Sequence, residues 1–160
     1  LSEAGYKKFA FVGGVEGSST SIERQRGFIT RLVELGHENW QVIDAGRYSY
    51  DAGYDATLRL FGRSDVPDAL FFADDILACG GMDAVRYELG LAIPNQVGVI
   101  GMDDMGLAGT RAYQLSTVRQ PFGEMVQEAV SALLRHMNDA SLEAQEVVLP
   151  CELVTRGSVK

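Results

Sequence analysis

The fold of this chain is decided by two stretches, Val99-Ile-Gly-Met-Asp-Asp104 and Leu115-Ser-Thr-Val-Arg-Gln-Pro121. The first is a short apolar run that ends in two adjacent carboxylates, a pattern typical of a buried parallel strand that opens into a loop. The second predicts another strand, after which Pro121 starts a helix. In open α/β sheets ligands bind outside the carboxyl ends of the strands, so Asp103 and Asp104 are the first candidates for a functional role.

Strand and helix patterns alternate along the rest of the chain. Short apolar runs predict strands at residues 8–12, 40–43, 68–73, 97–100, 115–118, 146–149 and 152–155. Apolar residues at helical spacing predict helices at 21–35, 51–61, 76–89 and 122–137, and residues 138–145 read as a polar linker. This order, with short connections, predicts an α/β fold with a three-layer α/β/α arrangement and a mostly parallel sheet.

The length and composition fit one globular domain with an acidic surface. The chain has 160 residues and a formal net charge of −8, with 22 acidic against 14 basic side chains. A domain that grips nucleic acid needs a basic face, so we expect this chain not to contact DNA itself. It has no apolar run long enough to span a membrane and no signal-peptide pattern, so we expect a cytoplasmic protein without a membrane partner. Cys79 and Cys151 are expected to be buried free thiols.

A loop rich in hydroxyl groups separates the first predicted strand from the first predicted helix. Ser18, Ser19, Thr20 and Ser21 lie where backbone N–H groups at a helix N-terminus favour an anion or a polar ligand. The other interpretation is a flexible turn with an N-cap, which the residues alone favour. The glycines before them lack the spacing of a dinucleotide-binding fingerprint, and the chain has no P-loop.

Two tyrosines, Tyr48 and Tyr50, follow the second predicted strand. An aromatic face packs well against a sugar or a purine, and the hydroxyl adds a polar contact. A loop aromatic that folds onto the surface, or one that contacts a second copy of the chain, would have the same sequence pattern.

Two acidic pairs, Asp74-Asp75 and Asp103-Asp104, follow the third and fourth predicted strands, so they should lie at the same end of the sheet. Three interpretations stay open: helix caps and loop carboxylates, a Mg²⁺ site, or acceptors for hydrogen bonds from ligand hydroxyl or ring N–H groups. A Mg²⁺ site of the receiver-domain kind needs acidic residues after the first strand and a lysine after the fifth. The chain has neither, so we reject that version of the Mg²⁺ interpretation.

The sequence offers little for covalent catalysis. His37 and His136 lie far in sequence from any candidate nucleophile, and the chain has no nucleophile elbow, zinc-protease motif or Cys-x-x-Cys pair. We therefore expect no enzymatic activity and no cofactor.

Further stretches join the opening two in one ordered set: Arg24-Gln-Arg-Gly-Phe28, the run from Asp68 to Gly80, Gly90-Leu-Ala-Ile-Pro-Asn-Gln-Val97 and Leu153-Val-Thr-Arg-Gly-Ser158. Together they resemble the effector-binding core of lactose-repressor-type (LacI/GalR) transcriptional regulators, over nearly the whole chain and in the family's order. The resemblance implies one lobe of a periplasmic-binding-protein-like fold.

The resemblance also implies how the chain divides. Residues 1–118 and about 146–160 resemble the C-terminal lobe of the family's core. Residues of about 119–145 correspond to a hinge crossover and a helix that packs on the N-terminal lobe, which is not in this sequence. We expect the apolar face of helix 122–137 to fold back on this lobe, to exchange with a neighbouring chain, or to sit against segments outside this sequence.

Ligand-binding residues follow from the same resemblance. Asp103 matches a carboxylate that binds the effector, Asp74 a polar side chain that faces it, Tyr48 an aromatic ring of the pocket, and Ser18, Ser19 and Thr20 a lining loop. The second aspartate of each acidic pair, Asp75 or Asp104, is expected to cap a helix or brace a loop. The effector-binding arginine of the family has no clear counterpart in residues 17–23.

The function that the resemblance implies is effector sensing and dimerisation in a bacterial DNA-binding transcription regulator. We expect a small-molecule effector, a sugar, and a homodimer with contacts at Cys79, Met82 and Leu107, while DNA is bound only through a domain outside this chain. Two other functions stay open. They are a periplasmic sugar-binding protein that serves a transporter, and a Mg²⁺-dependent hydrolase or phosphotransferase that uses the aspartate pairs.

Overall fold

The computed structural model describes residues 1–139, 141–143 and 145–160. The strands are β1 (Phe9–Gly13), β2 (Trp40–Asp44), β3 (Ala69–Phe72), β4 (Gly98–Met102), β5 (Ser116–Arg119) and β6 (Glu152–Val154). The helices are α1 (Ser19–Glu34), α2 (Tyr50–Phe61), α3 (Asp75–Asp83) with the π-helical turn η1 (Ala84–Glu88), and α4 (Phe122–Asn138).

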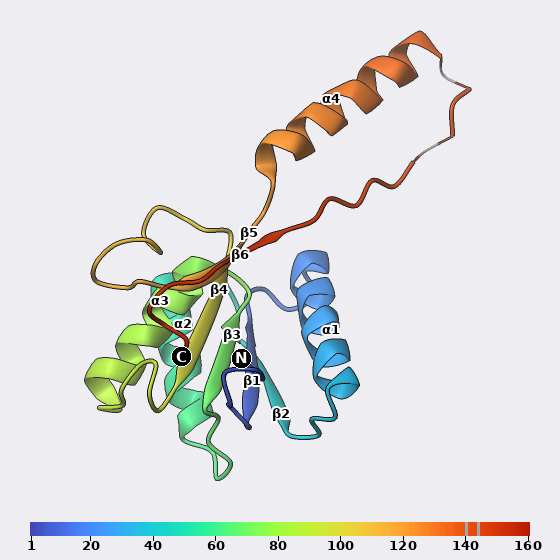
Figure 1. Cartoon of the computed structure of the whole chain (residues 1–160). Helices are drawn as coiled ribbons and strands as arrows, with labels where there is room; N and C mark the ends of the chain where they lie inside the picture. The colour runs from blue at the N-terminus through green and yellow to red at the C-terminus, as the bar shows by residue number, and fades with distance from the viewer. Residues whose placement is uncertain (140, 144) are drawn as a thin grey trace.

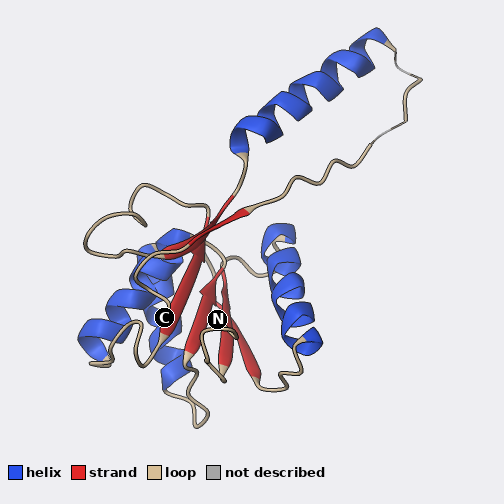
Figure 2. Ribbon diagram, in the orientation of Figure 1, coloured by secondary structure: helices blue, strands red, loops and turns tan. Residues whose placement is uncertain are grey.

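The six strands form one sheet in the order β2-β1-β3-β4-β5-β6. The first five strands are parallel, and β6 pairs antiparallel with β5. Helix α1 lies on one face of the sheet, and α2 and α3 lie on the other (Figures 1 and 2). The predicted α/β fold with a mostly parallel sheet between helices is therefore confirmed.

The strand order places a topological switch point at β1 and β3. From β1 the chain moves to β2 on one side and then to β3, β4 and β5 on the other. Open α/β sheets bind ligands beside such a point, at the carboxyl ends of the strands. The fold thus singles out the loops after β1, β3 and β4.

The core lies mainly between the sheet and the pair α2 and α3. Every residue of β1 is buried, and β3 is nearly so, because central parallel strands are covered on both faces. The largest fully buried side chains include Phe11, Leu70, Phe72, Leu77 and Met82. A smaller apolar cluster on the side of α1 contains Tyr6, Phe9, Leu32 and Ala69.

The predicted helix at 76–89 has the expected length but not the expected regularity. The α-helical part ends at Asp83 and continues as the π turn η1, where the Leu89 N–H reaches the carbonyl of Ala84 at 3.0 Å. A π turn takes in one more residue than an α turn does. The wider turn keeps Val85 buried and leaves Tyr87 78% exposed.

The predicted strand at 146–149 is wrong. Residues 145–150 have no regular structure, and Val148 is 82% exposed. A strand needs a partner to pair its backbone groups, and this segment runs out beyond the sheet toward α4, where no strand lies beside it (Figure 2). The prediction that Cys151 is buried is wrong for the same reason, whereas Cys79 is a buried free thiol as expected.

Helix α4 extends away from the sheet and has no buried residue (Figure 1). An apolar hollow separates it from the returning chain and is lined in part by Met125, Ala129, Val147 and Leu149. Helix α4 therefore does not fold back on the lobe, which rules out one of the three expected positions for its apolar face. Residues 140 and 144 of the predicted linker lie outside the described residues. No helix in the described part of the chain is long and apolar enough to cross a membrane.

Candidate functional site

The predicted ligand-binding aspartates lie at the carboxyl edge of neighbouring strands. Asp74 comes two residues after β3, and Asp103 follows β4 directly. β3 and β4 pair in parallel, so both strands end at the same edge of the sheet. The loop after β1, with its serines, leads into α1 beside them.

Arg24 joins this edge from the second turn of α1. Its Nη2 lies 3.3 Å from Asp103 Oδ1, and its Nη1 donates a 2.6 Å hydrogen bond to the carbonyl of Ala73. The Arg24 and Asp103 side chains are only 16% and 24% exposed. The sequence analysis found no arginine counterpart in residues 17–23, and it did not include Arg24 among the candidate site residues. A usable signal was its position four residues after Thr20, which puts both residues on the same face of the helix.

Asp103 has a second partner from the crossover. The Gln120 side-chain amide donates to Asp103 Oδ1, the same oxygen that faces Arg24. The Asp103 backbone has φ 102°, and its N–H donates to the carbonyl of Val118 at 2.8 Å. Asp103 thus connects α1, β5 and the first residues that lead to α4.

Asp74, and not Asp75, caps the next helix. Asp74 Oδ1 accepts a 2.8 Å hydrogen bond from the N–H of Leu77 at the start of α3. Burial raises the pKa of Asp74, and the nearby Asp103 charge adds to that rise. The cap is therefore Asp74, which was expected to face the ligand, whereas Asp75 accepts a hydrogen bond from the Met105 N–H and so braces the loop after β4, one of its two expected roles.

The remaining predicted ligand residues lie on the loops after β1 and β2 and at the start of α1. The Tyr48 ring packs on Gly14, where an added Cβ would lie 2.3 Å from the ring, and its buried hydroxyl has no hydrogen-bond partner among the residues that the structure describes. The Ser18 and Thr20 hydroxyls lie 2.9 Å from each other. Ser19 is exposed on the first turn of α1.

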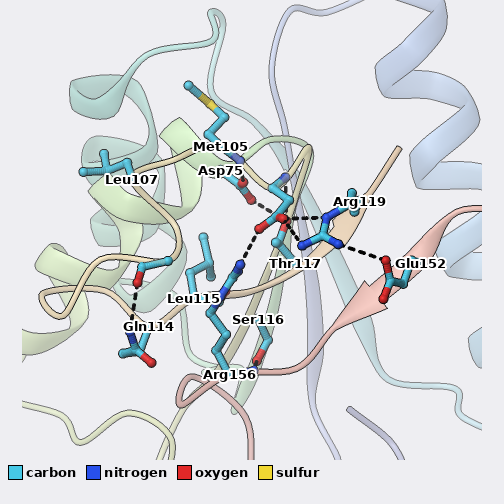
Figure 3. A network of polar contacts seen from close by, with 12 residues as sticks. Asp75, Met105, Leu107, Gln114, Leu115, Ser116, Thr117, Arg119, Glu152 and Arg156 are labelled. Carbon is cyan, nitrogen blue, oxygen red and sulfur yellow. Dashed lines mark hydrogen bonds and ion pairs between the residues drawn. The ribbon is translucent and has the colours of Figure 1, made fainter. Parts of the chain in front are cut away.

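Asp104 braces the chain as expected. One carboxylate oxygen lies 2.6 Å from Arg119 Nη2, and the other lies 2.6 Å from Arg156 Nη2. Arg119 also pairs with Glu152 at 3.0 Å, so the network ties β5 to β6 (Figure 3). Burial acts to raise the pKa of Asp104, but the hydrogen bonds from Arg156 and Arg119 outweigh it and the pKa is lowered.

The expected dimer contacts separate into two groups. Cys79 and Met82 are fully buried within the chain, so they have no surface to offer a partner, and the prediction is wrong for them. Both side chains are covered because α3 packs against the sheet and against α2. Leu107 is 38% exposed and stays a predicted contact.

No group of three His, Cys, Asp or Glu side chains suited to a metal ion occurs in residues 1–139, 141–143 and 145–160. The charged partner of Asp103 at the edge is an arginine. Carboxylate, guanidinium, amide and aromatic groups gather there beside a helix N-terminus. Fold and edge together define one lobe of an α/β binding protein.

The amino-acid sequence matches the family described as periplasmic binding protein-like domain over residues 1–159, and the chain belongs to that family. It is 29% identical to the probable HTH-type transcriptional repressor ExuR of Bacillus subtilis, over 99% of this chain and 47% of ExuR. It is 36% identical to the HTH-type transcriptional regulator AscG of Escherichia coli, over 84% of this chain and 40% of AscG. The chain thus spans about half the length of these relatives.

Solved structures agree with this assignment. A lac repressor dimer bound to operator and the anti-inducer ONPF superposes with a TM-score of 0.88 at 26% identity, over 99% of this chain and 54% of that one. A LacI-family sugar-binding regulator of Escherichia coli, complexed with phosphate, gives a TM-score of 0.84 at 32% identity, over 99% and 56% of the two chains. The predicted resemblance to the effector-binding core of LacI-type regulators is confirmed.

Proposed function

We propose that this chain is the effector-sensing part of a bacterial transcription regulator, and that the carboxyl edge around Asp103 is its half of the effector cleft. The observation that carries the proposal is the placement of Asp103. This carboxylate follows β4, which lies next to the switch-point strand β3, and it pairs with Arg24 from α1. A carboxylate and a guanidinium held side by side offer acceptors and donors to the hydroxyl groups of a sugar.

The mechanism that we propose couples the ligand to the crossover. Asp103 Oδ1 accepts from Gln120, which directly precedes the proline at the start of α4. A ligand hydroxyl that takes this acceptor competes with Gln120. The position of the crossover, and of whatever packs on α4, then shifts with occupancy between two states.

The partners follow from the same proposal. The effector is a small molecule, a sugar, and the chain forms a homodimer in the cytoplasm. DNA is contacted by a domain other than these 160 residues, because the chain carries a net charge of −8. The division of the chain at about 119–145 into a crossover and a helix for another lobe is supported by the exposed apolar side chains of α4.

The regulator is favoured over the other two functions. The relatives that the chain matches are named as transcriptional repressors, which supports a regulator over a periplasmic transport protein and over an enzyme. The Mg²⁺-dependent reaction is disfavoured because arginines already neutralise Asp103 and Asp104. No covalent chemistry and no cofactor are part of the proposal.

The test is a thermal-shift screen of sugars, polyols and nucleobases on the complete gene product that carries this chain. A ligand at 100 times its dissociation constant adds about 2.7 kcal/mol of stability. In a domain of 150–250 residues that corresponds to a rise of about 5–10 °C in the melting temperature. Asp103→Ala should abolish the shift, and Asp65→Ala, which removes an exposed carboxylate paired with Lys8, should keep it.

Two outcomes would count against the proposal. A shift that survives Asp103→Ala would move the cleft away from this edge. Stabilisation by Mg²⁺ alone, lost in Asp103→Asn, would favour the hydrolase or phosphotransferase.

A further inference from the structure

The Asp75 carboxylate joins three elements of the lobe. Its residue is 1% exposed although it lies at the start of α3. Asp75 Oδ1 accepts a 2.6 Å hydrogen bond from the Thr117 hydroxyl on β5, and Oδ2 accepts one of 2.7 Å from the Met105 N–H. Figure 3 shows these contacts between α3, β5 and the loop after β4.

The loop that Asp75 contacts has an unusual backbone. Asp103 and Asp104 have φ values of 102° and 52°, a left-handed region that residues other than glycine adopt only where their surroundings hold them. Three N–H groups anchor the turn: Asp103 to the Val118 carbonyl at 2.8 Å, Asp104 to the Thr117 hydroxyl at 3.4 Å, and Met105 to Asp75 at 2.7 Å.

Two of these anchors depend on Asp75. It receives the Met105 N–H directly, and it orients the Thr117 hydroxyl so that its lone pair faces the Asp104 N–H. Thr117 is fully buried, and its hydroxyl has the Asp75 carboxylate as its acceptor. The carboxylate reaches this position because β4 has a glycine beside it, and a Cβ on Gly101 would lie 2.2 Å from Asp75 Oδ1.

We propose that Asp75 is a positioning residue of the effector site, which holds the strained turn at Asp103 and Asp104 in the conformation that presents the Asp103 carboxylate. The inference rests on the proposed function in one respect only, which is the binding of the effector by Asp103. The same loop continues to Leu107, the exposed residue of the candidate dimer contact. The buried Asp75 carboxylate therefore contacts a loop that leads both from the proposed effector site at Asp103 and to the surface near Leu107.

The test is amide hydrogen exchange, measured by NMR on the ¹⁵N-labelled protein. Thr117→Val keeps the side-chain shape and removes the hydroxyl between Asp75 and Asp104. We expect exchange at Asp104 and Met105 to be at least about tenfold faster. Local opening of the turn then breaks fewer hydrogen bonds and costs less free energy. The amides of Ala73 and Val99, which bond to Val12 and Ser158 within the fold, should keep their rates.

Three variants make the result specific. Thr117→Ser restores the hydroxyl and should restore slow exchange. Asp75→Asn turns one of the two acceptors into a donor and should speed at least one of the two amides. Thr57→Val is the control, since Thr57 is also fully buried and donates at 2.8 Å to the Gly53 carbonyl within α2.

Several results would overturn the proposal. They are fast exchange of Met105 in the unsubstituted protein, unchanged rates at Asp104 and Met105 in Thr117→Val, or equal acceleration at every amide in that variant. None of these measurements uses an effector. A negative result would therefore remove the positioning role without touching the proposed function, and a failed effector screen would leave the positioning role standing.

Discussion

At the scale of the residue, two adjacent aspartates after β4 have different surroundings. Asp103 faces the edge of the sheet, where Arg24 and Gln120 contact it. Asp104 faces the base of the crossover, where Arg119 and Arg156 enclose it. The left-handed backbone of this turn points the two side chains in different directions. Asp103 is thus the carboxylate that we propose for ligand binding, while Asp104 secures β5 to the C-terminal segment through Arg119 and Arg156.

The titration of Asp75 gives a prediction at this scale. Burial raises the pKa of Asp75 from 3.8 to about 6, with smaller contributions from Asp103 and Asp74, although Thr117 and Met105 donate to the carboxylate and act in the opposite direction. The folded protein therefore binds this proton more tightly than the unfolded chain. Its contribution to stability is present below about pH 4 and is lost as the pH rises through about 6, by about 3 kcal/mol.

Urea unfolding at several pH values checks this prediction. The difference in unfolding free energy between the original protein and Asp75→Asn should change by that amount across the window. The lowered pKa of Asp104 acts only at lower pH, so it does not obscure the change. Parallel pH curves for the two proteins would contradict the prediction.

At the scale of the element, close packing decides which glycines can be replaced. In β4 an added Cβ on Gly101 would meet the Asp75 carboxylate at 2.2 Å and Leu115 at 3.0 Å. In α1 an added Cβ on Gly27 would meet nothing within 4 Å. The same change of one methyl group thus strains a buried junction in one element and improves helix propensity in the other.

We expect opposite results from these two substitutions. Gly101→Ala should lower the unfolding free energy by about 1–3 kcal/mol, because overpacking displaces Asp75 or bends β4. Gly27→Ala should raise it by about 0.5–1 kcal/mol. Urea unfolding of both variants is the measurement, and a Gly101→Ala variant as stable as the original protein would show that the junction at Asp75 is loose.

At the scale of the whole molecule, the lobe and the crossover have different surfaces. Five parallel strands have helices on both faces, whereas α4 and residues 145–151 project from the sheet (Figure 1). Apolar side chains of α4 such as Val126, Leu133 and Met137 are more than half exposed. An exposed apolar face of that size promotes association, so we expect another lobe or another chain to cover α4.

The surface near Leu107 supplies the prediction at this scale. We expect the protein to be a dimer in sedimentation equilibrium, and Leu107→Arg to raise the dimer dissociation constant at least about tenfold, because a charge would be buried at the contact. Val66→Arg is the control, since Val66 is 39% exposed and Leu107 is 38% exposed. A monomeric original protein would contradict the predicted dimer. Equal dimerisation of both variants would show that the dimer contact does not include Leu107.

The sequence by itself determined the alternation of strands and helices and placed the two aspartate pairs at one edge of the sheet. Parallel strands are buried on both faces, so their apolar runs can be recognised from the sequence alone. Because β3 and β4 are parallel neighbours, the polar residues that follow them share one edge of the sheet. The shared edge of Asp74 and Asp103 was predicted on that basis, whereas their ligand roles came from the family resemblance and the bracing role of Asp104 from its place as the second aspartate of its pair. The irregular structure of residues 145–150 was not predicted, because an apolar run becomes a strand only where another strand pairs with it.

Only the tertiary structure decided which side chains meet. Arg24 reaches Asp103 because α1 packs on the sheet with its Arg24 face toward the carboxyl edge. The orientation of α1 on the sheet cannot be deduced from residue spacing. The rotation of α3 decides that Asp74 caps the helix while Asp75 is buried beside Thr117. The packing of α3 against α2 and the sheet likewise buries Cys79 and Met82 completely. Sequence patterns record what each residue prefers, whereas contacts between distant residues depend on how the elements are packed together.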